Sequence, residues 1–221
     1  DIMGGDAEFC KKLDSCLFTS EKTTGRNQAD VTGLIGQYCH GNEPSQHTAY
    51  LYAYSGQAYK TQELVRQILT TLYSTKPEGI CGNDDAGQMS AWYVMSAMGF
   101  YPVCPVDNQY VVASPLFEKI TIHLENGKDF IIEAPNAEKT PYVKAIKLNG
   151  KDHNKSFINY EDIKDGGEIH FTMSENAVKD FAKAKQDRPF SKIEKDLICV
   201  VPYVSYEGTG TFTKNIEVNF S

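Results

Sequence analysis

The sequence predicts an α+β fold in which helices come first and strands follow. Apolar residues recur at helical spacing up to about residue 100, and short alternating runs separated by Gly, Asn and Pro replace them after Tyr101-Pro102. Segregated helices and strands are typical of an α+β domain or of two domains in contact. We therefore expect a partial helical segment over residues 1–100 and a β-rich region over residues 101–221.

Four helices are predicted in the first part. The apolar spacing places them within residues 1–19, at Ser45–Tyr54, at Lys60–Ser74 and at Ala86–Gly99. The last of them, AGQMSAWYVMSAMG, is apolar on most sides, which indicates a deeply buried helix. Gly-rich turns between the helices favour antiparallel hairpins. Two arrangements stay open: a small bundle, or the end of a larger helical barrel whose earlier helices lie outside this chain.

Seven short strands are predicted in the second part. They cover Tyr110–Ala113, Lys119–Leu124, Phe130–Ala134, Val143–Leu148, Glu168–Met173, Leu197–Val201 and Ile216–Phe220. Asn126-Gly127 and Asn149-Gly150 stand between alternating strands, which is a strong hairpin signal. The pattern favours a β-sandwich or a layered sheet. The charged stretch Val178–Arg188 is expected to be a short helix or a solvated linker.

Composition and charge argue against several classes of protein. A net charge of -7 opposes binding to nucleic acid or to an anionic membrane, because phosphates would be repelled. No apolar run is long enough to span a bilayer. The chain starts at Asp1 without a charged-then-apolar leader, and we expect it to be part of a longer or processed product. Its six cysteines form no C-x-x-C pair, which indicates buried thiols, with one or two disulfides possible in an exported protein.

Two acidic turns with flanking glycines are the strongest candidates for function. The first is His40-Gly41-Asn42-Glu43-Pro44, and the second is Gly82-Asn83-Asp84-Asp85-Ala86-Gly87. Each precedes a predicted helix, and turns of this kind present side-chain oxygens without regular structure. Two such turns are able to converge on one sugar or one metal ion.

Each acidic turn also has a purely structural interpretation. Asp84 or Asp85 at the start of a helix is stabilised by free backbone N–H groups, which is the role of an ordinary N-cap. Glu43 beside Asn42 supplies the hard oxygen ligands that calcium prefers, although the spacing is not that of an EF-hand. The plain alternative is a helix start with Pro44 at its first position and Glu43 exposed.

Histidine and aromatic residues near the turns have the same two interpretations. His40 and His47 are seven residues apart, which is not the spacing of a helical zinc pair, and a single histidine is more often a satisfied structural residue. Trp92 and Tyr93 are able to stack on a sugar, although aromatics at helical spacing usually lie in the core. Serine-nucleophile elbows and Walker motifs are absent from the sequence.

Three segments resemble glycoside hydrolase family 92: GLIGQYCHGNEPSQHTAYLYAYSGQAYKTQE, GNDDAGQMSAWYVMSAMGFYPV and YVVASPLFEKI. The resemblance runs from about Gly4 to the end of the chain and is strongest between Gly33 and Phe117. It implies a calcium-dependent, exo-acting α-mannosidase that inverts anomeric configuration, with α-1,2-mannosidases of N-glycan degradation among the implied activities. It also implies an (α/α)6 catalytic barrel, of which this chain holds the last helices and a β-rich, sandwich-like C-terminal region.

The resemblance implies roles for individual residues. Glu43 matches the calcium-ligating glutamate of the family, and Asn42 and Gln28 are implied as further ligands of Ca2+. Asp85 matches the carboxylate that acts as general base. Asn83 matches a position where the family often has Asp, which weakens the case for a paired carboxylate. The implied sugar contacts are His40, His47, Lys60, Gln88 and Trp92.

Besides Asn83, the sequence departs from the family pattern in four further places. Asp84 replaces a common Glu, and Gln46 replaces a common His in the P-S-H-H run. The general acid of the family, a glutamate in an aromatic-rich segment, has no counterpart here, and neither has the N-terminal β-sandwich. The resemblance therefore implies a C-terminal fragment that carries the base and the metal site and is inactive or nearly so alone.

The implied partners are a mannose-containing glycan and the remainder of the parent chain, and the implied location of the parent protein is secreted, periplasmic or on the outer surface. Apolar helix faces without partners favour self-association. The alternative from another class is a non-catalytic carbohydrate-binding or structural module with its sugar site on the strands. A related α/α-toroid phosphorylase would need a phosphate site of basic residues, and none clusters near the acidic turns.

Overall fold

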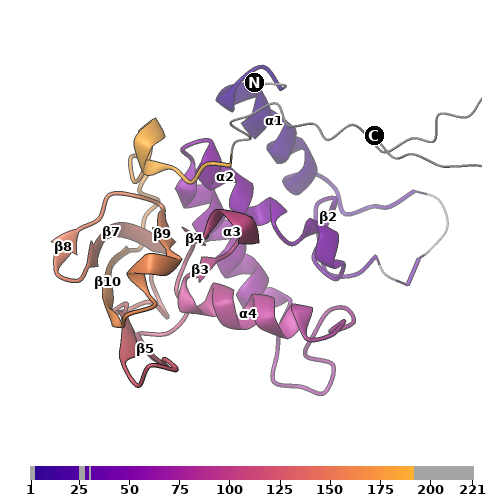
Figure 1. Ribbon diagram of the computed structural model, residues 1–221. Helices are drawn as coiled ribbons and strands as arrows, with labels where there is room; N and C mark the ends of the chain where they lie inside the picture. Colours follow the sequence, from indigo (N-terminus) through magenta and orange to yellow (C-terminus); the bar gives the residue numbers. More distant parts are fainter. Residues whose placement is uncertain (1–2, 25–27, 30, 192–221) are drawn as a thin grey trace, which may run out of the picture. The chain divides into compact units, whose positions relative to one another are not determined.

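The structure is a computed structural model that describes residues 3–24, 28–29 and 31–191 (Figure 1). Residues up to Phe190 belong to one compact unit. The chain is a mixture of helix and sheet, as the α+β prediction requires. None of its described helices combines the length and the apolar content that crossing a bilayer demands. The described residues contain four α-helices: α1 (Asp6–Leu17), α2 (Leu51–Tyr54), α3 (Ala58–Thr71) and α4 (Gln88–Met98).

The first and third helices follow the predicted apolar spacing. On α1, Cys10, Leu13 and Leu17 are buried, which gives the three- and four-residue steps of one helical face. On α3, Leu64 and Ile68 lie on the buried face. Both helices were expected from these residues, and their existence is confirmed to within a few residues at each end.

The second predicted helix is shorter than expected. The 3₁₀ turns Glu43–Ser45 and Thr48–Tyr50 replace the first part of the predicted Ser45–Tyr54 helix, and only Leu51–Tyr54 is α-helical. Pro44 at the start lacks an N–H, and the hydroxyl of Ser45 donates to the Asn42 carbonyl over 2.8 Å. Such local hydrogen bonds compete with the regular helical ladder.

The fourth helix is not buried on most sides. Met89, Trp92 and Ala97 are enclosed, but Val94 is 55% exposed. The prediction of deep burial for α4 is therefore wrong for the described chain, because only one side of this apolar helix packs against other elements.

Within the part of the chain that the structure describes, the strands form two larger sheets and one small hairpin. The five-stranded sheet has the order β5-β6-β10-β7-β8, in which only β6 and β10 pair in parallel, and the three-stranded sheet has the order β3-β4-β9. The bounds are β1 Leu34–Ile35, β2 Tyr38–Cys39, β3 Phe100–Tyr101, β4 Gln109–Val112, β5 Lys119–His123, β6 Asp129–Glu133, β7 Tyr142–Leu148, β8 Lys151–Asp152, β9 Phe157–Asn159 and β10 Gly167–Ser174.

Both predicted hairpins are confirmed. Strands β5 and β6 pair antiparallel across Asn126-Gly127, and β7 and β8 pair across Asn149-Gly150. Asn149 (φ 49°) and Gly150 (φ 74°) both have the positive φ that a tight two-residue hairpin turn requires. Within Val178–Arg188 the structure contains bends and a 3₁₀ turn at Lys185–Asp187 in place of an α-helix. The predicted strands Leu197–Val201 and Ile216–Phe220 lie outside the described residues.

Polar contacts join the helical segment to the strands. The side-chain oxygen of buried Gln62 on α3 accepts the backbone N–H of Val143 on β7 over 3.1 Å. The guanidinium of Arg66 donates to the hydroxyl of Ser114 over 2.8 Å and to the carbonyl of Pro115 over 2.5 Å. These contacts hold α3, which follows the first acidic turn in the chain, against the strand-rich residues.

Candidate active site

The structure brings the two acidic turns into backbone contact. A Cβ added to Gly82 would lie 2.5 Å from the carbonyl oxygen of Gly41 and 2.8 Å from its Cα. On the other side, the N–H of Gly41 donates to the Thr32 carbonyl over 3.1 Å, and the N–H of His40 donates to the Gly33 carbonyl over 3.0 Å. The segments around residues 33 and 41, at the two ends of one hairpin, therefore meet the segment around residue 82, some 40 residues further along the chain.

A buried amide also links the two turns. The Nε2 of Gln88, at the start of α4, donates to the Oε1 of Gln46 over 3.1 Å and to the hydroxyl of Tyr101 over 3.1 Å. Gln46 is buried, and its own Nε2 donates to the sulfur of Met89 over 2.8 Å. The side chain of Gln46 thus connects the residues after the first turn to α4.

In the first turn, Glu43 has a buried carboxylate oxygen without a partner. Its Oε1 accepts no hydrogen bond from any residue that the structure describes. A buried carboxylate oxygen left without a hydrogen bond or a cation costs several kcal/mol. A hard divalent cation would remove that cost, and oxygen donors of this type suit calcium.

The other expected calcium ligands are less defined. Asn42 has an exposed side chain, and its carbonyl is occupied by the N–H of Ser45 (3.2 Å). Gln28 is exposed, and its carbonyl accepts the N–H of Val31 over 3.2 Å. Among the described residues no group of three or more His, Cys, Asp or Glu side chains could hold a metal ion. A calcium shell would therefore have to combine Glu43 with amide or backbone oxygens, which is common for this ion.

In the second turn, the adjacent carboxylates have different environments. Asp84 accepts the N–H of Ser90 at Oδ1 and the hydroxyl of Ser90 at Oδ2, both over 2.8 Å. Asp85 is exposed, and no hydrogen bond or ion pair involves its side chain within the described ranges. The structural interpretation, a carboxylate held at the start of the helix, therefore applies to Asp84. Asn83 is likewise exposed beside it.

The backbone of the second turn is strained at Asp85. Asp85 (φ 34°), Ala86 (φ 58°) and Gly87 (φ 89°) have positive φ in succession. For residues with a Cβ this conformation costs about 1–2 kcal/mol each. The strain is located where the chain presents an unbonded carboxylate, and such outliers often mark functional sites.

His40 lies in the core and is fully hydrogen-bonded. Its Nδ1 is 2.7 Å from the hydroxyl of Tyr38, and its Nε2 is 2.7 Å from the hydroxyl of Tyr73. The Tyr73 hydroxyl donates its proton to the Met89 carbonyl over 3.2 Å, so Nε2 carries the imidazole proton and Nδ1 accepts from Tyr38. Burial lowers the pKa of His40 to about 4, which keeps the ring neutral at pH 7.

Trp92 is enclosed beside His40. Neither side chain has exposed surface, and their ring centroids are 4.4 Å apart. The Trp92 ring also lies parallel to that of Tyr73, at 6.2 Å. The sugar contacts expected for His40 and Trp92 have no surface available in this structure, which matches the structural interpretation of both residues.

Of the three remaining expected sugar contacts, Gln88 is bound to Gln46 and Tyr101, and His47 and Lys60 differ in availability. His47 is exposed at the start of a 3₁₀ turn. The ammonium of Lys60 is bound by the carboxylate of Asp14 on α1 over 2.7 Å and lies 4.9 Å from the ring centroid of Tyr52. Burial raises the pKa of Asp14, but the hydrogen bonds from Lys60 and Tyr52 outweigh that effect and lower it. Lys60 therefore serves to join α3 to α1 in this structure.

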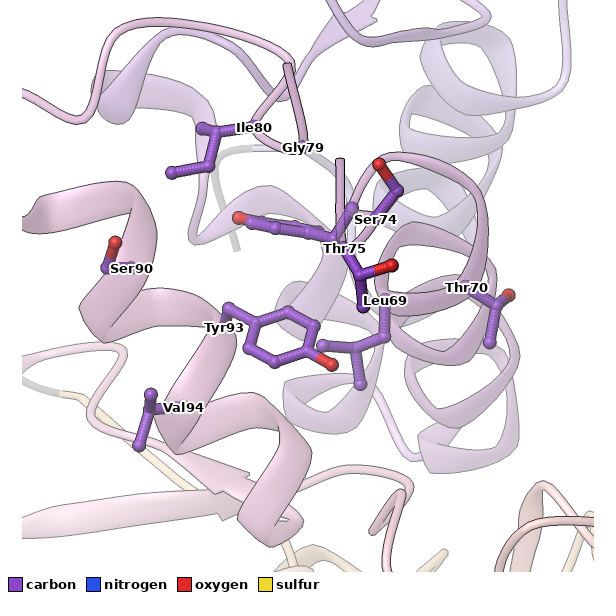
Figure 2. Close-up of a pocket in the computed structure, with 10 residues that line it drawn as sticks. Leu69, Thr70, Ser74, Thr75, Gly79, Ile80, Ser90, Tyr93 and Val94 are labelled. Atoms are coloured by element: carbon purple, nitrogen blue, oxygen red, sulfur yellow. The ribbon is translucent and has the colours of Figure 1, made fainter. Parts of the chain in front are cut away.

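An apolar groove lies next to the second turn. It has a volume of about 580 Å³ between α3, the loop at 74–80 and α4. Figure 2 shows Tyr93 pointing from α4 toward Leu69 on α3, with Ile80 above them. Ser90, which binds Asp84, also lines the groove.

The family model of the glycosyl hydrolase family 92 catalytic domain matches residues 1–175. This chain belongs to glycosyl hydrolase family 92. The resemblance predicted from the sequence is confirmed. The chain is also 30% identical over 177 residues to an uncharacterized secreted glycosidase of Arthroderma benhamiae, a match that covers 78% of this chain and 21% of that protein.

Solved structures of family 92 proteins superpose on this chain. The α-mannosidase BT3965 from Bacteroides thetaiotaomicron, in complex with mannoimidazole, is 40% identical with a TM-score of 0.81, covering 85% of this chain and 25% of that one. The inverting mannosidase BT2199 from Bacteroides thetaiotaomicron VPI-5482 is 38% identical with a TM-score of 0.73, covering 86% and 27%. The chain thus spans about a quarter of the length of these family 92 relatives.

Sequence reasoning missed several residues that shape this family 92 site. Gly41 and Gly82 were seen only as turn residues, although they form the contact between the turns. Tyr38 and Tyr73, which bind both nitrogens of His40, were not singled out. The only signal for the glycines was their place in the two acidic turns, because contacts across some 40 residues leave no local pattern.

Proposed function

We propose that this chain supplies the calcium site and the general base of an inverting exo-α-mannosidase that hydrolyses terminal α-mannosyl residues of glycans. The backbone contact between Gly41 and Gly82 carries the proposal, because it places the turns of Glu43 and Asp85 side by side. Membership of family 92 supports it, since one relative is named an α-mannosidase and another an inverting mannosidase.

Asp85 is the proposed general base. An inverting glycosidase needs one carboxylic acid to protonate the leaving oxygen and one carboxylate to deprotonate a water, at roughly 6.5–9.5 Å from each other. The carboxylate of Asp85 is exposed and unbonded, so it can accept the proton of the attacking water. Asp84 fixes the turn through Ser90, and Asn83 is proposed to orient the water or a sugar hydroxyl from the other side.

Glu43 is the proposed main calcium ligand, with Asn42 and Gln28 as further ligands. The buried, unpartnered Oε1 of Glu43 fits a hard cation, and the amide oxygens fit the same ion. When bound, calcium supplies a positive charge that can coordinate two mannose hydroxyls. For direct sugar contacts we propose His47 and Gln88, and for His40 and Trp92 we propose a supporting role beneath the first turn.

The general acid is proposed to lie on another part of the parent polypeptide, within an (α/α)6 barrel that this chain completes. Loss of a general acid typically costs on the order of 10²–10⁴ in rate. We therefore expect the 221-residue chain alone to be inactive or nearly so. The parent protein is proposed to be exported and to act on mannose-containing glycans, with α-1,2-linked N-glycan fragments as first substrates to assay.

Isothermal titration calorimetry with calcium chloride tests the metal half of the proposal. We expect the unaltered chain and Asp85→Asn to bind calcium, and Glu43→Gln to lose binding because it removes the charge at nearly constant shape. Glu78→Gln is the matched control, since Glu78 is exposed on the loop before the second turn.

A second titration uses mannoimidazole or mannose in the presence of calcium. Sugar binding that disappears in Glu43→Gln supports the proposed site. Calcium binding that Glu43→Gln leaves intact refutes the site. If sugar affinity is the same in Glu43→Gln and Asp85→Asn as in the unaltered chain, and is lost only when exposed residues of the strands are substituted, the chain is a carbohydrate-binding module instead.

A further inference from the structure

We infer that Gly82 is a positioning residue of this site: its missing side chain sets the distance between the turn of Glu43 and the turn of Asp85. The inference rests on the proposed function and goes beyond it, because it names the contact that fixes the turn of Glu43 relative to the turn of Asp85. Glu43 is two residues after Gly41, and Asp85 is three residues after Gly82. Only a very short stretch of chain therefore separates the contact from each carboxylate, and a displacement at the contact changes the distance between them.

Gly82 is required for space rather than for backbone conformation. Its φ lies outside the positive range that favours glycine, as does that of Gly41. A Cβ on Gly82 would instead lie 2.5 Å, 2.8 Å and 3.0 Å from the carbonyl oxygen, Cα and carbonyl carbon of Gly41. All three atoms belong to the backbone, so no side chain is available to rotate away.

The backbone of Gly41 is itself held from the opposite side. Its N–H donates to the Thr32 carbonyl, and a Cβ added to Gly33 would lie 3.4 Å from the same nitrogen. The hydroxyl of Thr32 is packed against Gly41 as well, and it is buried without a partner among the described residues. The first turn therefore has little freedom to yield, and an added methyl group at residue 82 must move the second turn away.

Replacing Gly82 by alanine is expected to change the distance between the two turns without changing the chemical groups that they carry. In Gly82→Ala the ligands of the first turn and the base of the second are all still present. Their separation changes, and a misplacement of about 1 Å can cost about 10² in rate in a positioned reaction. A purely structural glycine would lower stability but leave the separation of the folded turns unchanged.

Paramagnetic NMR measures this separation directly. Gd³⁺ replaces calcium at the first turn of the 15N-labelled chain, and the broadening of the amide signals of residues 83–87 reports their distance from the ion. We expect strong broadening in the unaltered chain and measurably weaker broadening in Gly82→Ala, because the effect falls steeply with distance from the ion, with ion affinity retained. The matched control is Gly127→Ala, because a Cβ there meets nothing within 4 Å. We expect this variant to keep the broadening of residues 83–87 even where its melting temperature falls.

Each outcome decides the inference. Undiminished broadening in folded Gly82→Ala overturns it. The inference is also overturned if the unaltered chain shows no broadening although Glu43→Gln abolishes ion binding, because the ion at Glu43 is then far from residues 83–87. This measurement on the unaltered chain decides the inference where Gly82→Ala does not fold.

If the unaltered chain binds no ion, the calcium part of the proposed function fails separately. The inference is then decided by nuclear Overhauser effects between residues 41–43 and 82–85. Loss of these Overhauser effects in Gly82→Ala but not in Gly127→Ala supports the inference. Where Gly82→Ala does not fold, the unaltered chain decides: absence of the Overhauser effects from it overturns the inference. Their persistence in Gly82→Ala overturns it.

Discussion

Protonation of buried His40 is expected to destabilise the fold in weak acid. The imidazole has no exposed surface, and both of its nitrogens are bound by tyrosine hydroxyls. Burial lowers its pKa from 6.5 to about 4. The unfolded chain therefore binds a proton at His40 between pH 6.5 and 4 that the folded chain does not bind. Stability contributed by the neutral ring is complete above pH 6.5 and is lost as the pH falls toward 4.

The size of the effect follows from the two pKa values. Since one pKa unit corresponds to 1.36 kcal/mol, linkage gives a loss of about 2.5 kcal/mol in the free energy of unfolding between pH 7.5 and pH 4.5. Carboxyl groups titrate as the pH falls further, and Asp14, whose pKa is lowered from its usual 3.8, acts in the same direction but mainly below that pH. The His40→Gln variant keeps these other groups, so the difference between the two proteins isolates His40.

Urea unfolding at several pH values measures this difference. His40→Gln is expected to be less stable than the unaltered chain at pH 7.5, because it loses packing and hydrogen bonds, and the gap should narrow by about 2.5 kcal/mol at pH 4.5. His47→Gln controls for removal of a histidine, since His47 is exposed. A gap between His40→Gln and the unaltered chain that does not change with pH would refute the buried neutral ring.

Three further predictions concern other contacts. Asp84→Ala should lower the free energy of unfolding by about 1–2 kcal/mol in urea, because it leaves the N–H of Ser90 without its partner, whereas Asp85→Ala should not lower it. Val94→Lys should reduce self-association seen by analytical ultracentrifugation, because Val94 lines the apolar groove. Val106→Lys should not reduce it, because exposed Val106 on the 3₁₀ turn Pro105–Asp107 does not line the groove. Lys60→Met should lower stability by at most about 1 kcal/mol in the same urea assay, because the carboxylate of its partner is partly exposed; a loss of several kcal/mol would contradict this reasoning.

Much of the fold was predictable because it is encoded locally. The hairpin between β7 and β8 needs positive φ at two turn residues, and Asn149-Gly150 provides them. The helix α3 was evident from a single apolar stripe. Strands β3, β8 and β9 escaped prediction because two or three residues cannot show an alternating pattern. The burial of α4 was overestimated because composition reports how apolar a helix is, not how many of its faces have partners.

The candidate site was only partly predictable. The sequence indicated both acidic turns, and family resemblance singled out Glu43 and Asp85. The sequence did not show that His40 is enclosed. One of its two hydrogen-bond partners, Tyr73, lies 33 residues away, and a contact over that separation leaves no local pattern. The contact of Gly41 with Gly82 is equally invisible in sequence, since it depends on the tertiary path of the chain.

The adjacent carboxylates of the second turn show how one local structure can separate two roles. Successive positive φ values at Asp85 and Ala86 turn the chain sharply before α4 and cost about 1–2 kcal/mol each. The two hydrogen bonds from Ser90 to Asp84 offset part of this cost, because hydrogen bonds to a charged group contribute about 1.5–3 kcal/mol. With Asp84 holding the start of the helix, Asp85 is not needed for capping and stays exposed and unbonded. A single aspartate would have to serve both purposes, and a carboxylate bound to a backbone N–H is a weaker base than a free one. The Asp-Asp pair therefore leaves the stability of the turn to Asp84 and keeps the carboxylate of Asp85 available for its proposed role as general base.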